Sequence, residues 1–256
     1  MSVPHETVGY TLPAWETTVD RARQTAYHGA AGIEPGLYGE AIDASVLAND
    51  CLHGARPRDA LGAKRLHVGV RVRQTAPVPL GTHLQVRAAV ETLEPVPRGR
   101  MIGIGFAFET EPGTAPIRIE HQSLILDGAS PKNATAKPAS PEEDFETIRR
   151  LQLTPEMVSG YSFEFPHLEG HHDPEAAKRI GMRAPIAQGL MGFTLLLAER
   201  WRLGPAEAID VTARFLRPIF WDDALTLQVD AAGKRLRALN SEGKAASAVE
   251  IHDWRT

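Results

Sequence analysis

The sequence has little of several features that mark secreted, membrane-spanning or nucleic-acid-binding proteins. Cys51 is the single cysteine among 256 residues, which excludes an internal disulfide and fits a reducing compartment. The longest apolar segment, residues 189–198, is about half the length that spans a bilayer. The N-terminal residues show no basic region followed by an apolar run, and the net charge is −4. We therefore expect a cytoplasmic protein with no secretory signal, no membrane contact and no nucleic-acid partner.

Alternation of apolar and polar residues is the main structural signal in both halves of the chain. In the first half it predicts four strands, whose apolar faces are Leu66, Val68, Val70 and Val72; Leu84, Val86, Ala88 and Val90; Ile102, Ile104, Phe106 and Phe108; and Ile117 and Ile119. In the second half it predicts strands at residues 209–216, 225–229, 234–238 and 245–251. The pattern indicates two antiparallel sheets.

The two halves share one motif on either side of a linker. Residues 129–141 are rich in Pro, Ala and Ser without periodicity, which is typical of a linker. The pattern Pro-Val-x-x-Gly-x-x-Leu-x-Val from Pro77 recurs as Pro-Ile-x-x-Asp-x-x-Leu-x-Leu from Pro218, an offset of 218 − 77 = 141. Because the match joins equivalent strands, it predicts a duplicated unit.

The helices distinguish the halves. Residues 189–201 are apolar on nearly every side, so this helix should be buried all round and wrapped by curved strands. The first half shows an amphipathic helix at residues 16–30 and a short one near 43–52, but no long apolar helix. Its sheet is therefore expected to leave room for a ligand, in a groove between Asp43 and Leu61 on one side and the start of the 189–201 helix on the other.

The segment 165–192 carries the strongest functional signal. It combines a His-rich turn, a short helix opened by Asp173-Pro174-Glu175, and the run Pro185-Ile186-Ala187-Gln188-Gly189 before the apolar helix. A helix start presents unpaired N–H groups and the positive end of the dipole. Such N–H groups polarise a carbonyl so that nearby polar side chains can act on it. This layout indicates an acyl-transfer or hydration site.

The residues resemble the MaoC-like family of (R)-specific enoyl-CoA hydratases and 3-hydroxyacyl thioester dehydratases. The resemblance rests on His171-x-Asp173-Pro174-Glu175-x-Ala177, Gly181, Pro185-Ile186-Ala187-x-Gly189 and Arg214-Phe215-Leu216-x-Pro218. It implies an α+β double hotdog fold, in which two antiparallel sheets each curve around a helix and the N-terminal helix is short or degenerate. The implied division is a degenerate hotdog at 1–128 that holds the acyl chain, a linker at 129–141, and a second hotdog at 142–256.

The chain departs from the family at the catalytic motif, Asp-x-Asn-Pro-x-His. With His171 as the motif histidine, Pro166 takes the Asp position and Glu169 the Pro position, and the step of eighteen residues to Gly189 needs no gap. The alternative register uses His172 and puts His167 at the Asp position, but displaces Asp173-Pro174. Gln188 stands where the family commonly has a histidine.

The resemblance makes six residues the candidates for the site: His171, Gly189, Glu169, Glu164, His167 and His172. His171 has the side chain best suited to proton transfer at cellular pH, or it only supports a polar turn. Glu164 or Glu169 is its carboxylate partner, or else a solvated loop residue. The Gly189 N–H is an oxyanion donor, unless the glycine serves only to pack helix against sheet. Asp173 is expected to be a helix N-cap.

Other chemistries have weaker support. The cluster from His167 to Asp173 contains metal-ligand types, but Pro166 and Gly170 disfavour a helical His pair and no second cluster completes a ligand set. Gly103-x-Gly105 lies in a strand pattern with no helix after it, which disfavours a phosphate loop. We expect no metal and no redox cofactor. The basic residues near the motif hold coenzyme A phosphates or are solvated charges: Lys178, Arg179, Arg183, Arg214 and Arg217.

The resemblance implies a hydratase/dehydratase that interconverts a 2-enoyl and a 3-hydroxyacyl thioester carried by coenzyme A or an acyl-carrier protein. The alternatives are a non-catalytic acyl-thioester-binding subunit of a heteromeric dehydratase, which the missing Asp favours, and a hotdog thioesterase. A homodimer, or a heteromer with another hotdog protein, is the expected assembly. Chain length, branching and carrier are open at this point.

Overall fold

Ten antiparallel strands form one continuous sheet in the computed structural model, which describes residues 6–55, 65–126 and 144–256. The strand order is β1-β3-β4-β5-β2-β7-β10-β9-β8-β6. The strands are β1 Trp15–Thr18, β2 Arg65–Gln74, β3 His83–Val96, β4 Gly99–Glu109, β5 Ile117–Leu126, β6 Phe145–Gln152, β7 Ala208–Phe215, β8 Ala224–Asp230, β9 Arg235–Leu239 and β10 Ala245–Arg255. The linker expected at 129–141 lies outside the described residues.

The two halves of this sheet are related by a pseudo-twofold axis. Counted inward from the edges, the halves run β1-β3-β4-β5-β2 and β6-β8-β9-β10-β7, and β2 pairs with β7 at the centre. In that pair Arg71 lies opposite Thr212, and 71 + 141 = 212. Thr212 is the residue that the sequence offset makes equivalent to Arg71, and the two lie opposite each other, so the axis passes between them. The two predicted sheets are joined through this central pair, in the manner of a two-fold interface.

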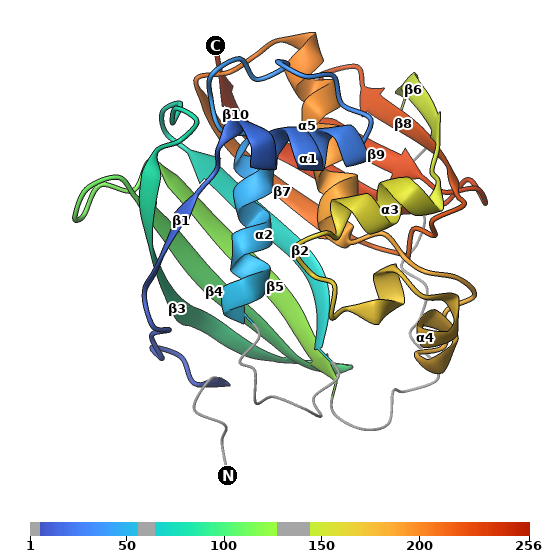
Figure 1. Cartoon of the computed structure of the whole chain (residues 1–256), viewed down its shortest axis with the longest axis horizontal. Helices are drawn as coiled ribbons and strands as arrows, with labels where there is room; N and C mark the ends of the chain where they lie inside the picture. The colour runs from blue at the N-terminus through green and yellow to red at the C-terminus, as the bar shows by residue number, and fades with distance from the viewer. Residues whose placement is uncertain (1–5, 56–64, 127–143) are drawn as a thin grey trace.

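The helices cover one face of the sheet (Figure 1). They are α1 Arg21–Ala30, α2 Ala44–Ala55, α3 Pro155–Tyr161, the 3₁₀ helix η2 Glu169–His171, α4 Pro174–Arg179 and α5 Gly189–Leu203. Every side chain of α5 from Leu190 to Glu199 is buried, as the all-round apolar sequence predicts. Among the described residues, no helix combines the length and the apolar character that a membrane crossing requires.

Helix α2 overturns the expectation of free space in the first half. It has 12 residues against 15 for α5, so it is short, but residues 44–52 are all buried. It packs against β2, β5 and α5. Ser45, Asn49 and Asp50 interrupt its apolar pattern, which is why the sequence did not mark it as a core helix. The space assigned to an acyl chain is therefore filled by α2. Leu61, which was expected to line the groove there, lies outside the described residues.

Three further local predictions needed correction. Residues Trp15–Thr18 form strand β1, so the first helix starts only at Arg21, with Asp20 as its N-cap. The β2 alternation is broken by a bulge between His67 and Gly69, which leaves Leu66 43% exposed and off the core face. Strand β6 was missed because its sequence, FETIRRLQ, has no buried face.

Candidate active site

Unpaired polar groups gather at the start of α5. Gln188 is the N-cap residue, but its side chain makes no capping hydrogen bond. The side chain is 4% exposed, and neither its amide nitrogen nor its amide oxygen has a hydrogen-bond partner. Among the described residues no acceptor contacts the Gly189 N–H either. An unpaired buried polar group costs about 1–3 kcal/mol, so native proteins retain such groups chiefly where a ligand or water completes them.

Gly189 also fulfils the packing role considered as its alternative. A Cβ added at this position would lie 2.6 Å from the ring of Phe215 on β7. The rings of His67 on β2 and Phe215 lie in an edge-to-face arrangement with centroids 4.7 Å apart, and His67 stacks on His121 of β5 with centroids 3.9 Å apart. A glycine is therefore required for α5 to lie this close to the sheet. Its N–H still belongs to the open first turn of the helix.

His171 is tied to the segment that leads into α5. Its Nδ1 donates to the carbonyl of Ile186 at 2.7 Å, and the N–H of Ile186 donates to the carbonyl of Gly170 at 3.1 Å. Because a carbonyl only accepts, Nδ1 carries the proton and the lone pair of the neutral ring lies on Nε2. The half-buried imidazole is thus anchored at Ile186, three residues before Gly189, and has the tautomer that a general base needs.

His172 and His167 occupy different surroundings. His172 Nε2 donates to the Phe165 carbonyl at 3.3 Å, and its Nδ1 accepts from the Ser159 hydroxyl at 2.9 Å. Both ring nitrogens are thus used to hold the loop against α3, which favours the register with His171 as the motif histidine. His167 is exposed.

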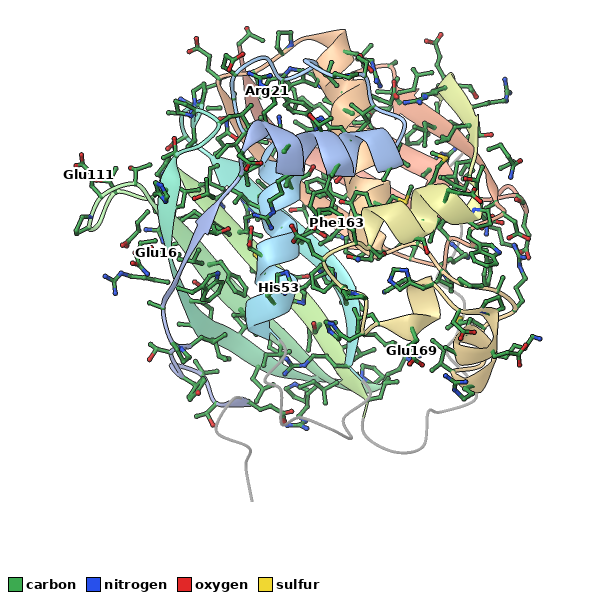
Figure 2. All side chains as sticks on the ribbon, viewed as in Figure 1. Glu16, Arg21, His53, Glu111, Phe163 and Glu169 are labelled. Atoms are coloured by element: carbon green, nitrogen blue, oxygen red, sulfur yellow. The ribbon has the colours of Figure 1, made fainter. Side chains whose placement is uncertain are left out.

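Glu169 and Asp173, the two acidic residues on either side of His171, are each engaged in another interaction. Glu169 is paired with Arg179 at 2.8 Å, and both side chains are 64% exposed. Figure 2 shows Glu169 well away from α2, in the direction of α4. That placement argues against Glu169 as the partner of His171. Asp173 accepts from the N–H groups of Glu175 and Ala176, which confirms it as the N-cap of α4.

Glu164 belongs to a charged cluster built across the two halves, referred to below as the Arg23 cluster. Arg23 of α1 donates through Nε and a terminal nitrogen to Glu164 at 2.6 and 2.9 Å, and contacts Asp50 of α2 at 3.2 Å. The side chains of Arg23, Glu164 and Asp50 are only 16%, 17% and 7% exposed. His53 of α2 reaches Glu164 at 3.4 Å. Sequence reasoning singled out Glu164 but not Arg23, because the two residues are 141 positions apart and meet only through the fold.

Glu164 should make stability sensitive to acid. Burial raises its pKa, but hydrogen bonds from His53 and Arg23 outweigh burial and lower the pKa from 4.5 to about 2. A folded-state pKa below the unfolded value stabilises the protein above the unfolded value, and this contribution is lost as pH falls towards the folded value. Asp50 differs, since burial raises its pKa despite Arg23.

We expect the free energy of unfolding, measured by urea titration, to fall less steeply between pH 4.5 and 2 in Glu164→Gln than in the unmodified protein, over the window set by the two pKa values. Identical slopes would contradict an ionised Glu164 in the folded state.

Two further features of the described residues concern metal binding and a surface depression. No group of three or more His, Cys, Asp or Glu side chains within them is placed to hold a metal ion. A depression of about 320 Å³ is lined by Arg71, Arg87, Gly105 and their neighbours. These residues alternate with buried ones along β2, β3 and β4, so the depression lies on the outward face of the sheet, opposite the helices.

Two five-stranded halves, each with a central helix and joined about a pseudo-twofold axis, define a double hotdog fold. HtdX from Mycobacterium tuberculosis is similar in structure, with a TM-score of 0.70, 21% identity, and 96% of this chain and 99% of that chain covered. A MaoC-like dehydratase from Phytophthora capsici gives a TM-score of 0.75 at 16% identity, covering 99% and 98% of the two chains. An acyl-ACP thioesterase from Bacteroides thetaiotaomicron gives 0.55 at 9% identity, covering 94% and 96%.

These similarities establish the fold. The chain has the hotdog architecture of MaoC-like dehydratases along its whole length, as the sequence resemblance implied. Neither the family models nor the curated proteins contain a match to the sequence. The chemistry must therefore be argued from the site itself.

Proposed function

We propose that this protein is a hydratase/dehydratase for an acyl thioester bound at the start of α5. The observation that carries the proposal is the pairing of an open helix N-terminus, with Gly189 N–H and the Gln188 amide unsatisfied, and an imidazole oriented by a bond to Ile186. A thioester carbonyl oxygen is an acceptor that suits the Gly189 N–H. Withdrawal of electrons towards that oxygen makes the α-proton acidic and the β-carbon electrophilic.

In the proposed hydration, His171 Nε2 takes a proton from water while the water oxygen bonds to the β-carbon. The electron pair of the double bond moves to the α-carbon, and the negative charge that develops on the thioester oxygen is held by the Gly189 N–H. Proton delivery to the α-carbon then completes the 3-hydroxyacyl thioester. Dehydration follows the same steps in reverse.

A non-catalytic acyl-thioester-binding subunit is the second candidate, and one observation favours it. Pro166 stands where the family motif has its Asp, and Glu169, one of the two candidate carboxylates, is paired with Arg179 at the surface. A thioesterase is the third candidate, because a thioesterase is among the proteins of similar fold.

Purified protein alone, assayed with crotonyl-CoA and 3-hydroxybutyryl-CoA and with the same acyl groups on an acyl-carrier protein, tests the proposal. We expect loss of the enoyl absorbance without release of free thiol. Free thiol would instead identify a thioesterase. Activity only after addition of another hotdog protein would identify the binding subunit and contradict the proposal.

The unpaired Gln188 amide gives a separate prediction. Gln188→Leu should leave the free energy of unfolding unchanged or raise it, since it removes an unpaired buried amide that destabilises the fold by about 1–3 kcal/mol. It should also raise KM for the thioester, because the ligand loses a hydrogen-bond partner. Chemical denaturation and steady-state kinetics measure the two effects.

Gln24 supplies the matched control. It is also buried, at 6% exposure, but its amide nitrogen donates to the Ala41 carbonyl and its amide oxygen accepts from the Asp43 N–H. Gln24→Leu should therefore destabilise the fold by about 1–3 kcal/mol. An equal loss of stability in both variants would show that Gln188 is satisfied without a ligand.

A further inference from the structure

Helices α2 and α5 lie side by side with opposite directions, so the end of α2 approaches the start of α5 (Figure 1). One hydrogen bond fixes their register: the Thr194 hydroxyl donates to the Ser45 hydroxyl at 2.9 Å. From Thr194, the start of α5 at Gly189 is five residues back, roughly 7.5 Å along the axis. From Ser45, His53 is eight residues forward in the same direction, roughly 12 Å. His53 therefore stands just beyond the start of α5.

The side chain of His53 is held on two sides and open on a third. Its Nε2 lies 3.4 Å from Glu164 Oε2, and its ring stacks on Phe165 with centroids 4.3 Å apart at 19°. The side chain is 42% exposed, and within the described part of the chain Nδ1 has no partner. Figure 2 shows His53 on the lower part of α2, on the same side as Phe163.

Glu164 holds this imidazole from the opposite half of the molecule. Arg23 fixes the Glu164 carboxylate with two hydrogen bonds, and the carboxylate then faces His53 Nε2. A carboxylate that accepts from one ring nitrogen leaves the other nitrogen to exchange protons, which is the arrangement of an oriented catalytic imidazole. His53 and Glu164 thus form a His–carboxylate pair, and His53 stacks on Phe165, the neighbour of Pro166, which takes the Asp position of the family motif.

We propose that His53 is a second proton-transfer residue of the acyl-thioester site, contributed by the first half and positioned by Glu164 of the second. The inference rests on the proposed function and adds the group that the motif lacks. In hydration, His171 takes the proton of water as the oxygen–β-carbon bond forms. Protonated His53 then gives its Nδ1 proton to the α-carbon as the enolate collapses, and the two imidazoles return to their starting states by exchange with solvent. Water is thereby added and no other reactant is required.

The kinetic test uses His53→Gln, with His252→Gln as the control. His252 is exposed on β10, where its ring contacts the Thr212 hydroxyl. His53→Gln should lower kcat by about 100-fold or more and change KM little, since general acid–base groups contribute 100- to 10,000-fold. His252→Gln should leave both unchanged. A His53→Gln enzyme with normal kcat, in a protein that needs His171, would overturn the inference and leave the proposed function standing.

Glu164→Gln distinguishes positioning from mere packing. Because Glu164 is proposed to act through His53, Glu164→Gln should lower kcat in the unmodified protein but have no further effect on kcat in His53→Gln, whereas a packing role would lower kcat in both backgrounds. Equal losses of kcat in the two backgrounds would overturn the positioning role of Glu164.

Imidazole NMR signals give a readout that needs neither turnover nor a folded variant. On addition of acetoacetyl-CoA to the unmodified protein, the signals of both His53 and His171 should move. A response from His171 with none from His53 would overturn the inference alone. Absence of any turnover with CoA or carrier-protein thioesters would contradict the proposed function, and the catalytic role of His53 with it.

Discussion

Replacement of His171 by alanine is expected to lower kcat by about 100- to 10,000-fold, the usual contribution of a general acid–base residue. The imidazole is held by its Nδ1 bond to Ile186, so Nε2 is the nitrogen that exchanges a proton with the substrate in the proposed reaction. The same bond links η2 to the segment before α5, so alanine should also reduce stability by about 1 kcal/mol. Steady-state kinetics and thermal unfolding of the purified variant measure the two effects separately.

His171→Asn is the control that separates them. Its amide N–H can replace Nδ1–H as the donor to Ile186, while the variant lacks a titratable base. It should therefore keep the stability and lose the activity. His172→Ala should do the reverse, because both nitrogens of His172 hold the loop through Ser159 and Phe165. A fully active His171→Asn protein would exclude His171 as the base.

Replacement of Arg23 by methionine is expected to destabilise the protein by about 3 kcal/mol, the low end for a charge left unpaired in a buried site. Arg23 is the shared partner of Glu164 and Asp50, and all three side chains are less than one-fifth exposed. Without it, two carboxylates face each other across the halves. Urea unfolding at neutral pH measures the loss. The added changes Glu164→Gln and Asp50→Asn should recover part of it, as expected for coupled neighbours.

Arg21, on the same helix, provides the comparison for Arg23. It pairs with Glu40, but the two side chains are 58% and 82% exposed. Exposed ion pairs contribute about 0–1 kcal/mol, so Arg21→Met should change stability little. Similar losses from Arg21→Met and Arg23→Met would show that the Arg23 cluster is an ordinary surface network.

The sequence predicted the fold best where burial follows a regular period. The apolar faces of β3 and β4 are buried as predicted, and α5 begins at Gly189 and is enclosed by the sheet. The offset of 141 residues anticipated the symmetry that places Arg71 opposite Thr212. Failures came where a pattern is interrupted. The bulge after His67 moves Leu66 off the core face. Polar residues of α2 that form hydrogen bonds within the core, such as Ser45, interrupt its apolar pattern, so the sequence did not predict a buried helix there.

The candidate site was predictable only in part, because some of its residues meet through the fold and not through the sequence. The register of His171 with Gly189 came from a local motif, and its bond to Ile186 lies within the same segment. The contact of His53 with Glu164 spans 111 residues and depends on the pairing of the two halves. No spacing rule connects such positions, so the sequence offered Glu164 as a candidate carboxylate but gave no reason to place His53 beside it.

A crystal structure of the protein with 3-hydroxybutyryl-CoA or acetoacetyl-CoA bound tests the proposed site at the start of α5 most directly. We expect the thioester oxygen at about 2.7–3.1 Å from the Gly189 nitrogen, the range expected of an oxyanion donor. We also expect the β-carbon substituent within reach of His171 and the α-carbon within reach of His53. An acyl group bound elsewhere, such as the outward face of the sheet around Arg71 and Gly105, with no contact to the start of α5, would contradict the proposed site.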